Sequence, residues 1–488
     1  MKGRIEDLSA AVAEFGGHAL SLNLLGTYLR DSCHGDVNQR HELSLIDPAT
    51  QGGSHAKGII ASYEAWFGNG PELGVLRLLG LFNRIARPEE IDFLRRNTRI
   101  AHLTEKINSL SGQEWNRILT RLRGSQLLAS AREYESDALD AHPLVRAYFA
   151  DEVCKKYPKA WQEGHRRLYE YNTEAAKEKP DTEEEMRPLF DAVFHGCHAG
   201  RHVKALKDVM QPRVLRWNER TRPRFYSTNT LGLWADTVTA IRHFFKKPWT
   251  KVLNGFDQRD EAFLFTAAGA CLRALYRFPE AMEAMKEGLR VRLNLNEWIE
   301  ASFALRMLNQ IYIAIGRVKE AQDCGKESVE YADKGKKRYE DVEKGGAESA
   351  DKEKTRNKIF EDCICARARY AESLHHGARY AEDLGKAKRQ FEEALAMLRL
   401  SRVGQEGDLP DGFNEFEYCD LLITLGEYDL AKERARRMLN EEKRESKRGE
   451  YNPQPLWKGL SHLLLGKIEF IAACLRGRYK AESAHGNA

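Results

Sequence analysis

Apolar residues in the first third of the chain recur three or four positions apart, which is the spacing of one buried helix face. Two such runs are Val75, Leu78, Leu79 and Phe82, and Trp115, Ile118, Leu119 and Leu122. Between them, Pro88 precedes EEIDFLRR, and proline is well tolerated at a first helical position. The pattern predicts three helices here, after a helical segment over residues 1–70.

After Gly124 the helical spacing stops. The short runs QLLASAREY and DALDAH predict a two-stranded hairpin, and HPLVRAYFADEV returns to helix with Pro143 near its start. Three helices, a hairpin and a helix are the order of elements in a winged helix. We therefore predict a small winged-helix domain over residues 71–158.

From about residue 160 onward the chain is a series of helix pairs with an internal period. The anchors of this period are Gly269–Phe278–Ala281–Gly288, Asn309–Gly316–Val318–Ala321–Ser328 and Cys419–Gly426–Tyr428–Ala431–Met438. In each, twelve residues separate the first anchor from the alanine, and seven separate the alanine from the last anchor. Small residues at these places let two antiparallel helices approach closely.

Helix pairs that bury a face against their neighbours stack into a solenoid. We predict a mostly α fold, in which the winged helix precedes an α-solenoid of tetratricopeptide-like (TPR-like) helix pairs. A helical linker with the first helix hairpin is expected over 159–255, and the array over 256–480. Residues 333–357 and 401–412 are predicted as loops between repeats, and the tail after Lys480 as disordered.

Composition narrows the class of protein. Lys and Arg number 77 and Asp and Glu 73, so no global charge attracts nucleic acid or anionic lipid. The nine cysteines form no CxxC pair, which favours a reducing compartment. No apolar run approaches the ~20 residues of a membrane span, and the start MKGRIEDLSAA lacks a signal-peptide core. We expect a cytoplasmic location and no membrane.

Several groups of reactive residue types have both a chemical and a structural interpretation. The densest set of metal-ligand types is His195, Cys197, His198 and His202. Glycines break the helix there and the repeat pattern explains the segment, so no metal is expected. Cys363 and Cys365 are expected to be small buried residues on opposite sides of a helix, not a redox pair.

An arginine-rich segment raises the alternative of nucleic-acid binding. Its members are Arg213, Arg216, Arg220, Arg222 and Arg224, interleaved with Trp217, Phe225 and Tyr226. Such a pattern can track a phosphate backbone. A solvated loop, or a contact with acidic residues such as Glu183–Glu185, is the favoured interpretation.

Three stretches of sequence resemble one family. FGGHALSLNLLGTYL resembles the second helical element of the signal-transduction ATPases with numerous domains (STAND), which include NB-ARC and NACHT-like proteins of plant resistance and bacterial defence. LDAHPLVRAYF resembles the close of the winged helix in that family. DEAFLFTAAGACLRALYRFPEAM and FNEFEYCDLLITLGEYDLAKERA resemble the TPR tails of its bacterial members.

The resemblance implies roles for two residues. His142 matches the histidine that faces the bound nucleotide, and Gly17 matches the helix-opening glycine. A helix cap before Pro143 is the alternative for His142. Ala19 stands where the family has a proline that packs on adenine. No GxxxxGK[ST] phosphate-binding loop occurs, so the chain is expected to be no enzyme by itself. ADP or ATP with Mg²⁺ would be bound only through an ATPase core that this sequence lacks.

The resulting prediction is a ligand-sensing, regulatory interaction module. The winged helix would control the nucleotide state of the ATPase core, and the array would bind a protein ligand and favour an oligomerising state. A plain TPR scaffold is the alternative, and nucleic-acid binding through Arg213–Arg224 is the third. The first helix of each pair lines the concave side of such an array. On it, the predicted binding stripe contains Thr266, Arg273, Arg306, Gln310, Phe416 and Asp420.

Overall fold

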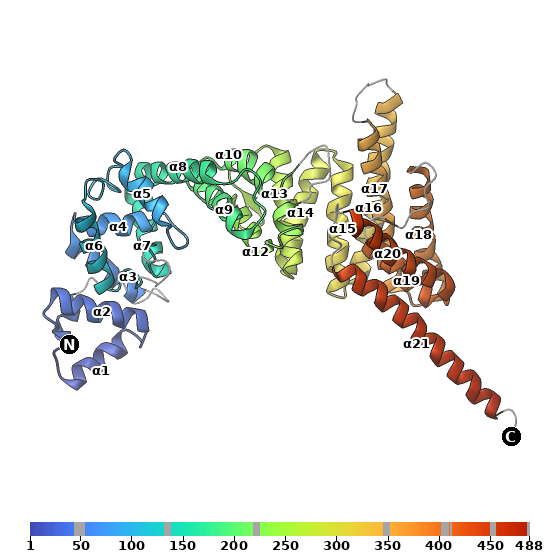
Figure 1. The fold of residues 1–488 in the computed structure, drawn as a ribbon, viewed down its shortest axis with the longest axis horizontal. Coiled ribbons are helices and arrows are strands. Elements are labelled where there is room, and N and C mark those ends of the chain that lie inside the picture. Colours follow the sequence, from blue (N-terminus) through green and yellow to red (C-terminus); the bar gives the residue numbers. More distant parts are fainter. Residues whose placement is uncertain are drawn as a thin grey trace. The chain divides into compact units, whose positions relative to one another are not determined.

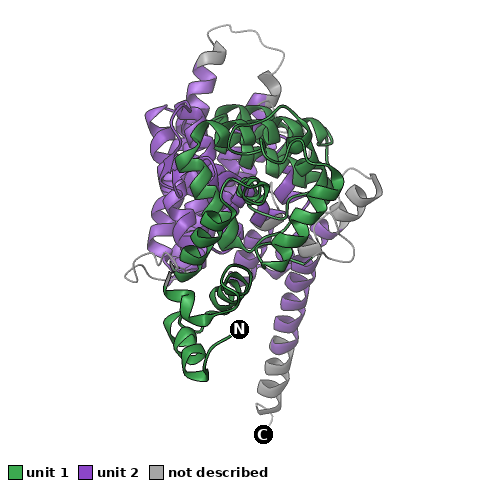
Figure 2. Cartoon of the chain, turned by 90° about the vertical axis from the view of Figure 1, so that its left-hand side faces the viewer, with its two compact units in different colours: residues 1–214 green, residues 215–488 purple. Residues whose placement is uncertain are grey.

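The fold is almost entirely helical (Figure 1). The computed structural model describes residues 1–42, 54–130, 138–217, 225–344, 352–401, 409, 412–448 and 455–485. The chain forms two compact units, Met1–Val214 and Leu215–Ala488 (Figure 2). The predicted mostly α, solenoid-like fold is confirmed. The finer division at residues 70, 158 and 255 stays a prediction.

The first unit contains the elements that precede the repeat array. They are α1 (Ile5–Glu14), α2 (Ala19–Ser32), the 3-10 helix η1 (Val37–Glu42), α3 (Ser54–Phe67), α4 (Pro71–Leu79), α5 (Pro88–Arg96), α6 (Gly112–Gly124), α7 (Pro143–Lys156), α8 (Pro158–Ala175), α9 (Glu183–His198), α10 (His202–Lys204) and the π-helix η2 (Ala205–Val214). One hydrophobic core extends from Phe15 to Leu168. Within it, Tyr63 and Thr27 share a hydroxyl hydrogen bond of 2.8 Å.

The structure describes the helices predicted for the winged helix but not its whole hairpin. Helices α4, α5, α6 and α7 form in the expected order, but residues 131–137 of the predicted hairpin lie outside the described residues. On either side of that gap, the Ala129 N–H donates to the Asp140 carbonyl at 2.9 Å, and Leu139 forms an isolated antiparallel bridge with Ala86. The winged-helix assignment therefore stays a prediction.

The second unit contains the helix pairs. Its elements are α11 (Tyr226–Asn229), α12 (Trp234–Arg242), the antiparallel strands β1 (Phe245–Lys247) and β2 (Lys251–Val252), α13 (Gln258–Ala274), α14 (Phe278–Asn294), α15 (Trp298–Ala314), α16 (Val318–Lys344), α17 (Lys352–Gly377), α18 (Ala381–Ser401), α19 (Gly412–Thr424), α20 (Tyr428–Arg448) and α21 (Pro455–His485). The pairs α13/α14, α15/α16, α17/α18 and α19/α20 each pack together. In the described part of the chain, no helix is both long and apolar enough to cross a membrane.

The anchors of the sequence period hold the helices of a pair together. A Cβ on Gly269 of α13 would lie 2.7 Å from Met285 Cγ of α14, so a larger residue there would force the Met285 side chain to move. In the next pair, the Asn309 amide donates to the Ala321 carbonyl at 2.7 Å. These contacts explain why small or polar residues recur at the anchor positions.

Two predictions about irregular segments are wrong where the structure describes them. Within 333–357, α16 continues to Lys344 and α17 begins at Lys352, with residues 345–351 outside the description. Lys, Glu and Arg are good helix formers, and Lys334 gains a cation–π contact 4.7 Å above the Trp298 ring. The tail after Lys480 is helical as far as His485. Most of the predicted loop 401–412 lies outside the described residues.

The turn between α13 and α14 contains an unfavourable residue. Tyr276 has a left-handed φ of 58° at the position where two other pairs carry Gly316 (φ 76°) and Gly426 (φ 82°). Its side chain is 80% exposed, so little packing would be lost on truncation. We expect Tyr276→Gly to raise the free energy of unfolding of the second unit by roughly 0.5 to 1 kcal/mol. Thermal and urea denaturation would measure the change. Gly316→Ala, as the matched control, should lower stability, and a destabilised Tyr276→Gly variant would contradict the strain argument.

Candidate functional site

The predicted binding stripe lies on the first helices of the pairs. Among these helices, α15 contacts α17, α17 contacts α19, and α19 contacts α21. Thr266 and Arg273 lie on α13, Arg306 and Gln310 on α15, and Phe416 and Asp420 on α19. Phe416 and Asp420 line a groove, and the other four residues do not.

Arg306 is buried, contrary to the expectation that it points into an open groove. Its Nη2 donates to Asp362 Oδ1 of α17 at 2.6 Å, and both side chains are 6% exposed. Arg306 therefore links neighbouring first helices. The Thr266 hydroxyl is likewise used locally, since it donates to the Ala262 carbonyl at 2.8 Å. Arg273 and Gln310 are half-buried, and their role in partner binding stays a prediction.

Phe416 and Asp420 line a groove between α19 and α21 with a volume of about 600 Å³. The other lining residues are His462, Leu463, Leu464, Gly466, Lys467 and Phe470. Leu463 is 59% exposed and Phe470 is 70% exposed, which are large values for such apolar side chains. We call this feature the α19/α21 groove.

The sequence of α21 explains why these side chains remain exposed. Leu464 and Ile468, four positions apart, are buried in the core with α19. Leu463 and Phe470, seven positions apart, lie on the adjacent stripe, with Lys467 between them. Lys467 pairs with Asp420 across the groove, so the two charges neutralise each other. The helix thus has a second apolar stripe beyond the one it needs for packing.

Leu463 and Phe470 are absent from the predicted stripe. The positions of the predicted stripe follow from the repeat anchors Gly269, Asn309 and Cys419, and α21 contains no such anchor. The spacing of Leu463 and Phe470 around Lys467 is a helical signal that could have identified them.

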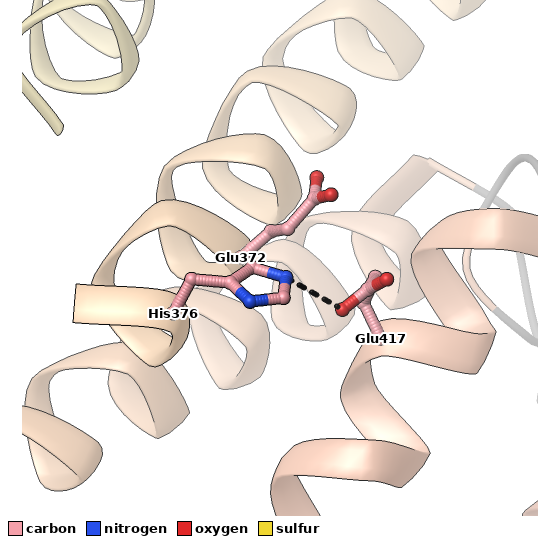
Figure 3. A group of neighbouring side chains, drawn as sticks. All are labelled: Glu372, His376 and Glu417. Carbon is pink, nitrogen blue, oxygen red and sulfur yellow. Dashed lines mark ion pairs between the residues drawn. The ribbon is translucent and has the colours of Figure 1, made fainter. Parts of the chain in front are cut away.

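A cluster of polar side chains lies close to the α19/α21 groove. It consists of Glu372 and His376 of α17 and Glu417 of α19, whose ligand-type atoms lie within 4.8 Å of one another (Figure 3). His376 Nε2 is 3.6 Å from Glu417 Oε2, and this carboxylate raises the pKa of His376. Burial raises the pKa of Glu372, although Arg369 Nη1 donates to its Oε2 at 2.7 Å. Within the described residues it is the one such group of three.

The ligand-type residues singled out in the sequence do not form such a group. His195 Nδ1 lies 2.9 Å from His165 Nδ1, and the His198 ring stacks on the His165 ring at 4.9 Å. Burial lowers the pKa of His198. Cys363 and Cys365 are 0% and 5% exposed, which confirms that they are buried residues of α17.

The two residues to which the family resemblance gives a role lie at helix ends: His142 before α7 and Gly17 after α1. His142 is the N-cap of α7, where its Nδ1 accepts a hydrogen bond of 3.2 Å from the Leu144 N–H. The cap alternative for His142 is thereby confirmed. Gly17 has a φ of 65° and its N–H donates to the Val12 carbonyl at 2.9 Å, which closes the end of α1. Their relation to a nucleotide stays a prediction.

The arginine-rich segment is only partly described. Arg213 donates to the carbonyls of Thr173 and Ala176, at 2.8 Å each, and so caps the end of α8. Trp217 packs edge-on against Phe263 of α13, with ring centroids 4.8 Å apart. Residues 218–224, with Arg220, Arg222 and Arg224, lie outside the described residues.

Comparison with known proteins gives likenesses to solved structures alone. No family model matches the chain, and no curated protein matches it. It is similar to the crystal structure of a STAND protein with a tetratricopeptide repeat sensor from Pyrococcus horikoshii, at 13% identity and a TM-score of 0.26. The match covers 99% of this chain and 69% of that chain. A score this low establishes no shared fold over the two chains.

Proposed function

We propose that this chain is a protein-interaction module whose TPR-like array binds an amphipathic helix of a partner protein in the α19/α21 groove. One observation carries the proposal: Leu463 and Phe470 of α21 are exposed along a largely apolar groove, to which α19 contributes Phe416. Grooves between helices that expose apolar side chains are common docking sites for amphipathic helices.

The chemistry of the groove favours an apolar occupant. Asp420 and Lys467 are paired, so the acidic and the basic side chain that line the groove neutralise each other. Nothing lies within 4 Å of a Cβ placed on Gly466, so the backbone of a partner can approach closely there. Burying a leucine or phenylalanine side chain contributes about 1.5 to 3 kcal/mol, and a few buried anchors typically carry most of the binding energy of an interface.

The test uses a displayed library of amphipathic helical peptides. Peptides selected on the wild-type chain should carry apolar residues at helical i, i+3 or i+4, and i+7 positions. We expect Leu463→Asp and Phe470→Asp each to weaken their binding by at least about tenfold, because each introduces an unpaired charge into the apolar contact. Fluorescence anisotropy would measure the dissociation constants.

Leu400→Asp is the matched control, because Leu400 of α18 is 74% exposed and lies outside the lining of the groove. All three variants should keep the circular dichroism spectrum of the wild type. Selected peptides that bind both groove variants as tightly as the wild type would exclude the α19/α21 groove. Equal weakening by Leu400→Asp would mean that the effect is one of charge alone.

We further propose that the module is the regulatory, C-terminal part of a STAND-type ATPase that acts in the cytoplasm. The sequence resemblance around Gly17 and His142 supports this role, and His142 is exposed beyond its cap hydrogen bond. Partner binding would then favour an open, oligomerising state, which requires that the partner bind that state more tightly than the closed one. Nucleotide and Mg²⁺ would be held by the ATPase core.

A further inference from the structure

We infer that Glu372, His376 and Glu417 form a binding site for a divalent transition-metal ion, for which zinc is the best fit. Glu372 and His376 lie four positions apart on α17, so their side chains share one helix face. Glu417 approaches this face from α19, and Figure 3 shows the three side chains gathered between the two helices. No part of the inference depends on partner binding.

The geometry of the cluster also fits a shared ion, beyond the direct ion pair of His376 with Glu417. His376 Nε2 and Glu417 Oε2 are 3.6 Å apart, which is too long for a hydrogen bond. Two ligands of a tetrahedral zinc ion, each about 2.1 Å from the metal, are roughly 3.4 Å from one another. All three ligand atoms lie within 4.8 Å of one another, so small side-chain rotations bring them to this spacing.

The donor atoms select the class of metal. An imidazole nitrogen suits zinc, copper, iron and nickel, whereas Ca²⁺ and Mg²⁺ prefer oxygen ligands alone. Zinc binds both histidine nitrogen and carboxylate oxygen, and zinc sites with three protein ligands hold water in the fourth position. The His376 side chain is 42% exposed, so an ion and its water can enter from solvent.

The neighbouring charges also permit a cation. As ligands of an ion, Glu372 and Glu417 would supply two negative charges, and Arg369 supplies one positive charge through its contact with Glu372 Oε2. The nearby Asp420 is paired with Lys467. His375 contacts the Thr424 hydroxyl at 3.2 Å and belongs to no ligand group. A divalent ion would link α17 to α19 and thereby fix the helix that supplies Phe416 to the α19/α21 groove.

The experiment compares zinc binding by the full chain and two histidine variants. Each protein is stripped with a chelator and titrated with ZnCl₂ by calorimetry in competition with a chelator of known affinity. We expect His376→Ala to bind one equivalent of zinc fewer at high affinity than the wild type. The dissociation constant of zinc at that site should rise at least about tenfold. His375→Ala, one residue away, should behave as the wild type. The difference between variants isolates this site from zinc held by other histidines and the nine cysteines.

Two further measurements complete the test. Glu417→Gln should also weaken the site, and Mg²⁺ should not compete with zinc for it. Equal zinc stoichiometry and affinity in the wild type and His376→Ala would overturn the inference, as would equal losses in His375→Ala. Phe470→Asp should leave zinc binding unchanged, so that failure of the peptide-binding proposal and failure of the metal site are distinguishable.

Discussion

Replacing Glu152 by Ala is expected to lower the free energy of unfolding of the first compact unit by about 3 to 5 kcal/mol. Glu152 of α7 accepts two hydrogen bonds from Arg77 of α4, at 2.9 Å from Nε and 2.6 Å from Nη2. The two side chains are 3% and 8% exposed. Since a guanidinium cannot be deprotonated in a protein, Arg77 would remain charged and buried without its carboxylate. Urea denaturation followed by far-UV circular dichroism would measure the loss.

A double variant separates the lost pair from the stranded charge. Arg77→Met with Glu152→Leu removes both charges and should be less destabilised than Glu152→Ala alone. Glu64 lies 3.9 Å from Arg77 Nη2 and can replace only part of the lost attraction. A Glu152→Ala variant that unfolds within about 1 kcal/mol of the wild type would mean that Arg77 finds water or another partner.

The helix pairs were predictable because their cause is local in sequence. Close approach of two helices joined by a short turn requires small residues at fixed positions, as at Gly269 beside Met285. The requirement recurs with each pair, so it appears as a period. The charged composition of the segment 333–357 predicts a loop, whereas its described residues are helical. Its helices are supported by neighbours, such as Trp298 beneath Lys334, that the segment itself does not reveal.

The candidate site was harder to predict because it depends on contacts between repeats. A helical pattern shows which positions share a face, but not which of them a neighbouring repeat covers. Phe416 and Asp420 line the α19/α21 groove, whereas Arg306 on an earlier first helix is covered by α17. The cluster of Glu372, His376 and Glu417 joins residues from α17 and α19, and no spacing in the sequence brings Glu417 to the other two.

A second large effect on the free energy of unfolding is expected from the buried ion pair of Arg306 and Asp362. Asp362→Ala is expected to lower the free energy of unfolding of the second compact unit by about 3 to 5 kcal/mol, because it leaves Arg306 charged between α15 and α17. The Arg306→Met, Asp362→Leu double variant should recover part of the loss. Both would be measured by urea denaturation alongside Leu463→Asp, which should stay within about 0.5 kcal/mol of the wild type, as surface substitutions usually do.

The same pair determines how partner binding should be probed. A substitution of Arg306 would weaken binding through loss of folded structure, even if Arg306 never touches a partner. Leu463 and Phe470 are free of this difficulty, since both are exposed. If Asp362→Ala unfolds at the same urea concentration as the wild type, Arg306 does not depend on its ion pair. Arg306 would still be covered by α17, and the ion pair would contribute little to the stability of the second unit.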